Sequence, residues 1–428
     1  MRSSARVAAA TFGLTLISVA NEARAGDGPP LALPTFGEPA LDPPPDPHRT
    51  RFFAIPNAAY DTDDGLGFGA RAELALMRPG YDPYRAAFVV HVFATLKGYM
   101  HHRVRLDVPG LGAGGRSRLT VHLAWRQWQN DGYWGIGNTT TRDRAYVGDF
   151  PDGDPRRKRY NYSLFQPFLH ATWRTALRGR WSIFESLNAK WSIVQAYEGS
   201  LLAEQRPYGM NGGLGLIFSA GVLYDSRTPE VGPERGVLLE LSGRAAIPGP
   251  NGAGEFNGPF GGVLVSARGF ISPKPWLTLG GRIMAEALFG EIPFYEMVHW
   301  GGFQPVAGFG GAETLRGTSF GRFRGPIKAI LNLEARIRMF GTPLGGRPLD
   351  WQLGIFGDFG AVCCTADNTT SGGLPIHPGG GAGLRLVFDH LFVGRFDVAV
   401  GADPVRELDG GITVLPNLGL YIVFDQAF

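Results

Sequence analysis

The segment Ile327–Phe340, with the sequence IKAILNLEARIRMF, alternates between apolar and polar residues along its length. Its odd-numbered positions are apolar: Ile327, Ala329, Leu331, Leu333, Ala335, Ile337 and Met339. Its even-numbered positions carry the polar residues Lys328, Asn332, Glu334, Arg336 and Arg338. Ile330 is the one apolar exception before the last residue. Because successive side chains of a strand point to opposite faces, this period of two predicts a long β-strand with one apolar and one charged face.

Later segments repeat the pattern: Trp351–Val362, Leu384–Phe388, Phe392–Gly401 and Leu418–Phe428. The strands of a soluble β-sandwich would show the same alternation. The residue types on the two faces therefore have to distinguish a sandwich from a membrane barrel. Here the polar face holds charges of both signs and glycines, strand after strand, and the strands exceed the usual length of about five or six residues in soluble sheets. Long strands with a broad apolar face favour a membrane barrel that has lipid outside and a polar lumen.

We therefore expect an all-β chain that forms a transmembrane antiparallel β-barrel of about 16 strands. The expected strands start near Arg51, Gly65, Arg85, Tyr99, Ser117, Tyr160, Arg180, Gly212, Gly236, Gly261, Trp276, Ile327, Trp351, Gly381, Phe392 and Leu418. With both termini on the periplasmic side, the long segments Gln129–Arg159 and Phe289–Pro326 become surface loops. The short turns Leu177–Gly179 and Pro273–Pro275 then fall at the periplasmic end.

The first residues predict export. A basic start at Arg2 and Arg6 precedes the apolar run Val7–Ala20, and Ala23-Arg24-Ala25 gives a small-x-small cleavage pattern. We expect a signal peptide over residues 1–25; an N-terminal membrane anchor is the alternative, although the run is shorter than the roughly 20 residues of a spanning helix. Residues 26–50 are rich in proline and predict an extended periplasmic tether, and the barrel is expected over residues 51–428.

Composition adds few constraints. Glycine accounts for 63 of the 428 residues and charged residues for 18%, which fits many turns and strands. The net charge of +3 indicates no nucleic-acid or polyanionic partner. Adjacent cysteines such as Cys363 and Cys364 close only a strained ring, so we expect an incidental loop pair. Metal binding is the alternative for this pair, but it lacks further ligands nearby.

The loop before Ile327 carries a recognisable motif. Gly310-Gly311 followed by Leu315-Arg316-Gly317 resembles the GG…(V/L)RG signature of the BamA/TamA-like superfamily of outer-membrane assembly and secretion barrels, also called the bacterial surface antigen family. Phe356–Gly360, FGDFG, resembles the F-x-D-x-G motif of the second strand after that loop. Glu334 resembles the inward acidic residue of the first strand after it.

Two further motifs occur in the order that the same superfamily shows. Tyr224–Gly232 resembles its periplasmic turn between the eighth and ninth strands, and Tyr60–Gly69 resembles its opening hairpin. The similarity covers about residues 51–428. Each motif alone is weak, whereas the ordered set is specific.

The resemblance implies that the sixth surface loop folds back into the lumen with Arg316. By parity alone, Glu334 and Asp358 both face the lumen on successive strands, and the planar guanidinium group suits carboxylates. The expected lumen loop lock consists of Arg316, Gly317, Glu334 and Asp358.

Gly310 and Gly311 are the expected hinge of that loop, because glycine allows the backbone to turn back at low steric cost. The alternative reading of the same residues is a solvated basic loop.

The C-terminal segment Asn417–Phe424, NLGLYIVF, fits the pattern that barrel-assembly machinery reads as an insertion signal. The expected signal residues are Gly419, Ile422, Phe424 and Phe428. A plain terminal amphipathic strand is the alternative. The expected partners are outer-membrane lipids and barrel-assembly machinery during biogenesis.

These observations predict a non-enzymatic protein of the bacterial outer membrane that assists protein or lipid export or insertion. Family members with that role carry POTRA domains, for which this chain offers only the Pro-rich tether, so we expect a separate periplasmic partner. The alternative is a passive diffusion pore or structural surface antigen with a loop-constricted lumen. His101, His102, His122 and His170 show no catalytic clustering, and the sequence indicates no cofactor or metal.

Overall fold

The computed structural model describes residues 50–424, apart from 62–64, 79–83, 149, 152, 230, 345–346, 364–374 and 389–391. The predicted signal peptide (1–25), residues 26–49 of the predicted tether, Cys364 and Phe428 lie outside the described residues. No helix in the part of the chain that is described is long and apolar enough to cross a bilayer.

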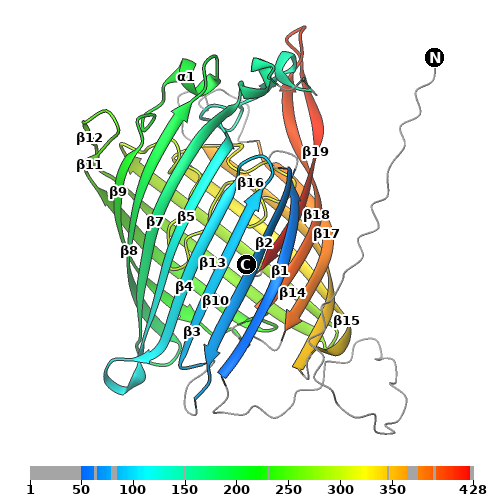
Figure 1. Ribbon diagram of the computed structural model, residues 1–428. Helices are drawn as coiled ribbons and strands as arrows, with labels where there is room; N and C mark the ends of the chain where they lie inside the picture. The colour runs from blue at the N-terminus through cyan, green and yellow to red at the C-terminus, as the bar shows by residue number, and fades with distance from the viewer. Residues whose placement is uncertain are drawn as a thin grey trace, which may run out of the picture. The chain divides into compact units, whose positions relative to one another are not determined.

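Long strands make up most of the described chain (Figure 1). Of nineteen strands, three have two residues and sixteen have 10 to 18 residues. The sixteen long strands are β1 (Thr50–Asp61), β2 (Gly65–Leu76), β3 (Ala86–Thr95), β4 (Met100–Leu111), β5 (Ser117–Gly132), β7 (Asn161–Ala176), β8 (Trp181–Ala196), β9 (Gly213–Asp225), β10 (Gly236–Ile247), β13 (Phe260–Lys274), β14 (Leu277–Gly290), β15 (Ile327–Leu344), β16 (Arg347–Cys363), β17 (His377–Phe388), β18 (Phe392–Arg406) and β19 (Ile412–Phe424).

The remaining elements are short and lie in the connections. They are the strands β6 (Arg142–Asp143), β11 (Gly249–Pro250) and β12 (Phe256–Asn257), the helix α1 (Leu201–Gln205), and the 3-10 turns η1 (Ala113–Gly115), η2 (Arg144–Tyr146) and η3 (Pro155–Lys158).

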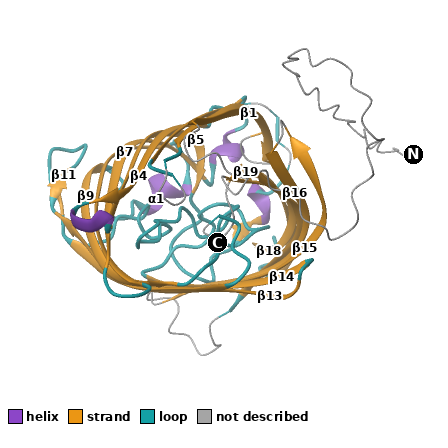
Figure 2. Ribbon diagram, turned by 90° about the horizontal axis from the view of Figure 1, so that it is seen from below, coloured by secondary structure: helices purple, strands orange, loops and turns teal. Residues whose placement is uncertain are grey.

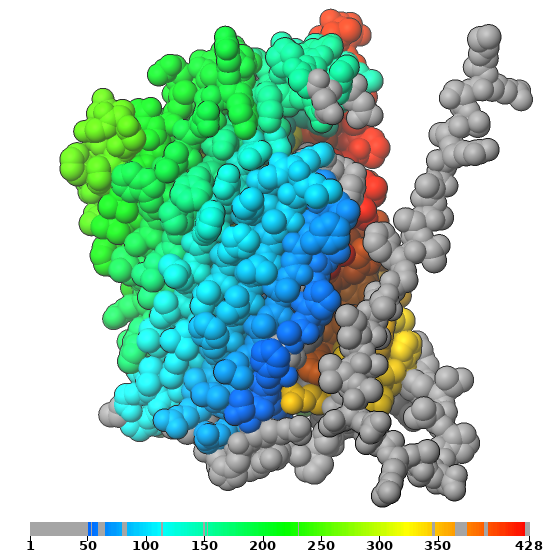
Figure 3. Space-filling view, in the orientation of Figure 1, coloured from blue at the N-terminus to red at the C-terminus, as the bar shows by residue number. Residues whose placement is uncertain are grey.

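Each long strand pairs with the next long strand in an antiparallel ladder, from β1–β2 through to β18–β19. The strands β1 to β9 lie side by side along one face of the wall (Figure 3). At the seam, β19 lies beside β1, and the view along the axis shows a ring of strands (Figure 2). The predicted all-β barrel of about 16 strands is confirmed, and the ladders between consecutive long strands pair backbone groups that lipid cannot hydrate.

Three strands begin earlier than the sequence predicts. β16 begins at Arg347 rather than near Trp351, β17 at His377 rather than near Gly381, and β19 at Ile412 rather than near Leu418. Each added segment contains one proline, Pro348, Pro378 or Pro416, and the segment before Gly381 also contains two glycines. Proline is unfavourable within a strand, and glycine has no side chain to show the alternation. The neighbouring strand nevertheless supplies a ladder for each of them.

The two faces of β15 are those that its alternation predicts. Leu333 is 48% exposed on the outer face, whereas its neighbour Glu334 is 3% exposed in the lumen. Large apolar side chains are exposed in the same way on the other long strands, for example Ile355 on β16 and Phe396 on β18. This outer face is suited to contact with hydrocarbon.

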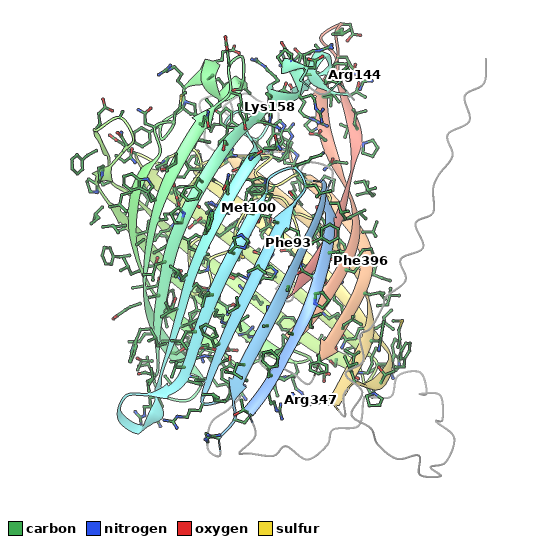
Figure 4. All side chains as sticks on the ribbon, viewed as in Figure 1. Phe93, Met100, Arg144, Lys158, Arg347 and Phe396 are labelled. Atoms are coloured by element: carbon green, nitrogen blue, oxygen red, sulfur yellow. The ribbon has the colours of Figure 1, made fainter. Side chains whose placement is uncertain are left out.

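The connections differ in length at the two ends of the barrel. Residues 133–160 and 291–326 form the two longest connections at one end, the long-loop end. Residues 177–180 and 275–276 form turns at the opposite, short-turn end. Figure 4 shows Arg144 and Lys158 at the long-loop end and Arg347 at the short-turn end. The predicted difference in connection length between the two ends is thus confirmed, while the position of the long loops at the cell surface stays a prediction.

Two adjacent residues of β9 test the assignment of faces. Phe218 is 50% exposed on the outer face, whereas Ser219 lines a cavity in the lumen. Phe218→Glu should lower the free energy of unfolding in phospholipid vesicles by about 2 kcal/mol, because it places a charge in hydrocarbon. Ser219→Glu, the matched control, should change it little. Urea titration measures both, and equal losses would contradict the assignment.

Candidate functional site

The connection between β14 and β15, residues 291–326, folds into the barrel and is called the inward loop here. Figure 2 shows loop segments within the ring of strands. The side chains of Phe309, Leu315, Arg316 and Phe323 in this loop are fully buried. Burial to this degree does not fit the alternative of a solvated basic loop.

Apolar side chains of the inward loop pack on an apolar patch of the inner wall. The cluster consists of Trp300, Val306, Phe309, Leu315 and Phe323 from the loop and Leu264, Met284, Ile330 and Val362 from strands β13 to β16. Met284 and Ile330 are register partners on adjacent strands. Ile330, the exception in the alternation of β15, is therefore a lumen-facing contact for the loop.

Arg316 reaches three carboxylates on three strands. Its Nε donates to Asp358 Oδ2 at 2.7 Å and its Nη2 to Asp358 Oδ1 at 2.9 Å, a bidentate pair. Its Nη1 donates to Glu334 Oε2 at 2.9 Å and lies 3.5 Å from Asp397 Oδ2. The backbone N–H of Arg316 also donates to Asp358 Oδ2 at 3.0 Å. The structure thus brings together Arg316, Glu334 and Asp358, as predicted from parity.

The guanidinium of Arg316 has an aromatic neighbour as well. Its Cζ lies 3.4 Å from the centre of the Phe356 ring, within the range of a cation–π contact. Asp358 accepts a further hydrogen bond from Asn332 Nδ2 at 2.7 Å. Both oxygens of this carboxylate are therefore occupied.

Further arginines complete the buried ion network. Arg385 donates to Glu334 through Nε at 3.1 Å and Nη2 at 3.0 Å, and it also pairs with Asp397. Arg336 Nε donates to Glu334 Oε1 at 2.9 Å, and Arg395 Nη1 lies 3.3 Å from Asp397 Oδ2. Four arginines thus share three carboxylates, which we call the Arg316 network: Arg316, Arg336, Arg385, Arg395, Glu334, Asp358 and Asp397.

Asp397 was not predicted from the sequence. It lies on β18, where it pairs in register with Gly383 of β17, next to the pair Arg385–Arg395. Its parity within Phe392–Gly401 places it on the polar face, so the signal was present. Its contact with Arg316 depends on the path of the inward loop inside the lumen, and the strand pattern does not specify that path.

Arg316, in the inward loop, keeps its positive charge although it is buried. Burial disfavours the positive charge and lowers the pKa. The hydrogen bonds and charge of Asp358, with the charges of Glu334 and Asp397, outweigh burial and raise the pKa of Arg316 above its ordinary value. The guanidinium therefore remains a cation in the lumen.

The backbone of the residue after Arg316 also contacts the wall. Gly317 has φ of +87°, and its N–H donates to Tyr421 Oη at 3.0 Å. Its carbonyl accepts from Asn417 Nδ2 at 2.8 Å. A Cβ at Gly379 would lie 2.1 Å from the carbonyl oxygen of Arg316, and one at Gly401 would lie 2.4 Å from that of Gly317. Glycines on β17 and β18 thus leave the space in which the loop sits.

The predicted hinge residues form a tight turn. Gly310 and Gly311 have φ of +103° and +83°. The N–H of Gly310 donates to Thr314 Oγ1 at 2.9 Å, and this hydroxyl donates back to the Gly310 carbonyl. The conformation needs glycine at both positions, while a role as a hinge stays a prediction.

Arg322 and Arg324, two further arginines of the inward loop, are also buried inside the barrel. Arg322 Nε donates to Asp403 Oδ1 at 2.8 Å and Nη1 to Thr140 Oγ1 at 3.0 Å. Arg324 donates to the carbonyl oxygens of Phe294 and Gly132. These contacts join the inward loop to β18 and to the connection between β5 and β7.

The predicted insertion signal lies on the last strand. Gly419 and Ile422 belong to β19, with Ile422 exposed on the outer face, and Phe424 ends the strand. Recognition of these residues by assembly machinery stays a prediction.

His101, His122 and His170 line the cavity in the lumen, whereas His102 contacts the exposed Trp125. His122 and His170 are register partners on β5 and β7, with ring centres 6.3 Å apart. Within the described residues, no group of three or more His, Cys, Asp or Glu side chains is arranged to hold a metal ion.

No protein-family model matches this sequence, and no curated protein matches it. Solved structures do match. BamA from Haemophilus ducreyi lacking POTRA domains 1-3 aligns with a TM-score of 0.52 and 14% identity, over 88% of this chain and 70% of that chain. CdiB from Escherichia coli aligns with a TM-score of 0.53 and 13% identity, over 87% of this chain and 61% of that chain.

At such identities these likenesses show the fold. The chain has the barrel fold of BamA and CdiB, which confirms the fold that the motif resemblance implied. It spans less than two thirds of the length of the CdiB chain.

The glycines of the wall give a test of how the inward loop is seated. Gly379→Ala should displace the loop, because its Cβ would meet the Arg316 carbonyl oxygen at 2.1 Å. Gly380→Ala is the matched control, since the nearest atom to its Cβ would be Phe356 O at 3.4 Å. Trypsin should cleave the folded Gly379→Ala protein faster within the inward loop and the control at the wild-type rate. Equal cleavage of all three proteins would contradict this seating.

Proposed function

We propose that this protein is an outer-membrane barrel of the BamA/TamA-like superfamily that assists export or insertion of protein or lipid without catalysing a reaction. The observation that carries the proposal is the inward loop fastened by Arg316 to Asp358, Glu334 and Asp397. The ordered motifs and the shared fold of BamA and CdiB support the same assignment.

The contacts of the inward loop favour a gated barrel over an open pore. The inward loop contacts strands from β13 to β19 through the apolar cluster, the Arg316 network and the hydrogen bonds of Gly317. A polypeptide held by several fully buried charge pairs is not displaced by solvent alone, because each broken pair leaves an uncompensated charge. A barrel built in this way can hold its lumen obstructed until a partner or client changes those contacts.

The outer face and the last strand indicate the location and the partners of the protein. The apolar outer face suits outer-membrane lipids, and the terminal strand suits recognition by barrel-assembly machinery. A separate periplasmic partner would deliver clients to the short-turn end. Each of these assignments is part of the proposal.

A passive diffusion pore is the second candidate. The observation that favours it is a cavity of about 460 Å³ in the lumen beside the inward loop. In that case the loop only narrows the channel, and the Arg316 network only fixes the constriction.

Conductance in planar bilayers separates the two candidates. The proposal predicts small, flickering currents for the wild-type protein and larger, steady currents when residues 303–321 are replaced by a Gly-Ser linker. Replacement of the exposed segment 144–158 is the control and should leave the currents at the wild-type level. Wide and steady wild-type currents that the loop replacement does not enlarge would favour the passive pore.

A further inference from the structure

The inward loop leaves one side of the lumen unfilled. The cavity there, of about 460 Å³, is lined mainly by the long strands from β2 to β10, by β13 and β14, and by residues 299–301, 303–307 and 313 of the loop. Its lining also includes residues 227 and 231–233 of the turn between β9 and β10, so it extends toward the short-turn end. A volume of this size matches a small-molecule site.

The charge of this cavity is strongly one-sided. Ten of the lining residues are arginine or lysine, whereas two are glutamate. Four further carboxylates pair with lining cations: Asp107, Asp225, Glu286 and Glu296. Six acids that line the cavity or form an ion pair with one of its cations therefore stand against ten cations. Glu240 and Asp131 act on Arg268 and Arg126 through charge, without an ion pair. In the Arg316 network, by comparison, three acids pair with four arginines. The excess of cations over acids is therefore larger around the cavity than in that network.

Two of these arginines hydrogen-bond only to neutral side chains. Arg126 on β5 is 7% exposed; its Nη2 donates to Gln166 Oε1 at 2.7 Å and lies 3.3 Å from His299 Nε2. Arg268 on β13 is 8% exposed, with Nη1 3.4 Å from Gln304 Oε1. Within the described chain, neither arginine forms an ion pair, and neither Nε atom has a hydrogen-bond partner.

Such an arrangement is costly without an anion. A buried cation needs a counter-charge and partners for its N–H groups. The planar guanidinium fork suits the oxygens of a phosphate group, which can accept several N–H bonds at once. Two nearly buried arginines that line one cavity and form no ion pair in the described chain therefore point to an anionic ligand.

The lining also has an apolar part. Trp300 and Phe303 of the inward loop, Phe168 of β7 and Ile217 of β9 line the same cavity. An organic group can pack on these side chains while its charged end meets the arginines. The wall of strands separates the cavity from lipid, so a ligand without acyl chains fits it better than a lipid headgroup.

We propose that this cavity binds a small, water-soluble organic phosphate, with Arg126 and Arg268 as its main charged contacts. This inference is independent of whether the barrel assists export. Because His299 and Gln304 of the inward loop contact these two arginines, the occupied site would lie directly against the loop.

Phenyl phosphate is a suitable probe, since it combines a phosphate with an aromatic ring. Isothermal titration of the full chain in an uncharged detergent should show saturable binding of phenyl phosphate. Phenol should not bind, and benzoate should bind more weakly. Arg126→Gln and Arg268→Gln should each weaken binding of phenyl phosphate by about tenfold or more, because each removes a charge-assisted contact.

Arg156→Gln is the control, because Arg156 is an exposed arginine of η3 outside the cavity. It should bind phenyl phosphate like the wild-type protein. Gel mobility before and after heating checks that each variant is folded, and Arg126 and Arg268 lie on different strands, so each variant tests the site separately. Absence of saturable binding to the wild-type protein would overturn the proposal. Wild-type affinity for phenyl phosphate in both cavity variants would overturn it as well, and so would binding of phenol or benzoate as tight as that of phenyl phosphate.

Discussion

The buried pairing of Arg316 with Asp358, Glu334 and Asp397 is the interaction on which the interior of this barrel depends. It connects one turn of a long surface connection to three wall strands, in a place without bulk water to solvate the charges. Buried ion pairs add little net stability, but loss of one partner leaves a costly isolated charge. The network therefore acts mainly to specify where the loop lies.

The outer face imposes the complementary constraint. A wall in contact with hydrocarbon must satisfy its backbone through ladders and present apolar side chains outward, so most charges carried by the strands are directed to the lumen. Glu185, near the start of β8, is an exposed exception. The lumen then has to be organised by matching those charges. On the side of β15 to β18 the strands and the inward loop match them closely, whereas on the side of β2 to β10 an excess of cations remains around a cavity.

Much of this could be predicted from sequence because strand parity and loop length are local properties. Parity placed Glu334 and Asp358 in the lumen, and the glycine-rich motif indicated that Arg316 descends to them. Asp397 and the space left by Gly379 were missed, since they depend on the register of strands β17 and β18 and on the path of the loop. The net charge of +3 likewise concealed the cationic cavity, because bulk charge says nothing about how charges are distributed across a wall.

A double-mutant cycle on Arg316→Gln and Asp358→Asn is the most direct test of the account. The free energy of unfolding in phospholipid vesicles, measured for the wild type, both single variants and the double variant, gives the coupling between these side chains. The account predicts a coupling of about 3 kcal/mol, because each single variant leaves a buried polar or charged partner unpaired. The same cycle on the exposed pair Arg156 and Asp154 should show none. Additive effects at Arg316 and Asp358 would contradict the claim that this pair holds the loop in the lumen.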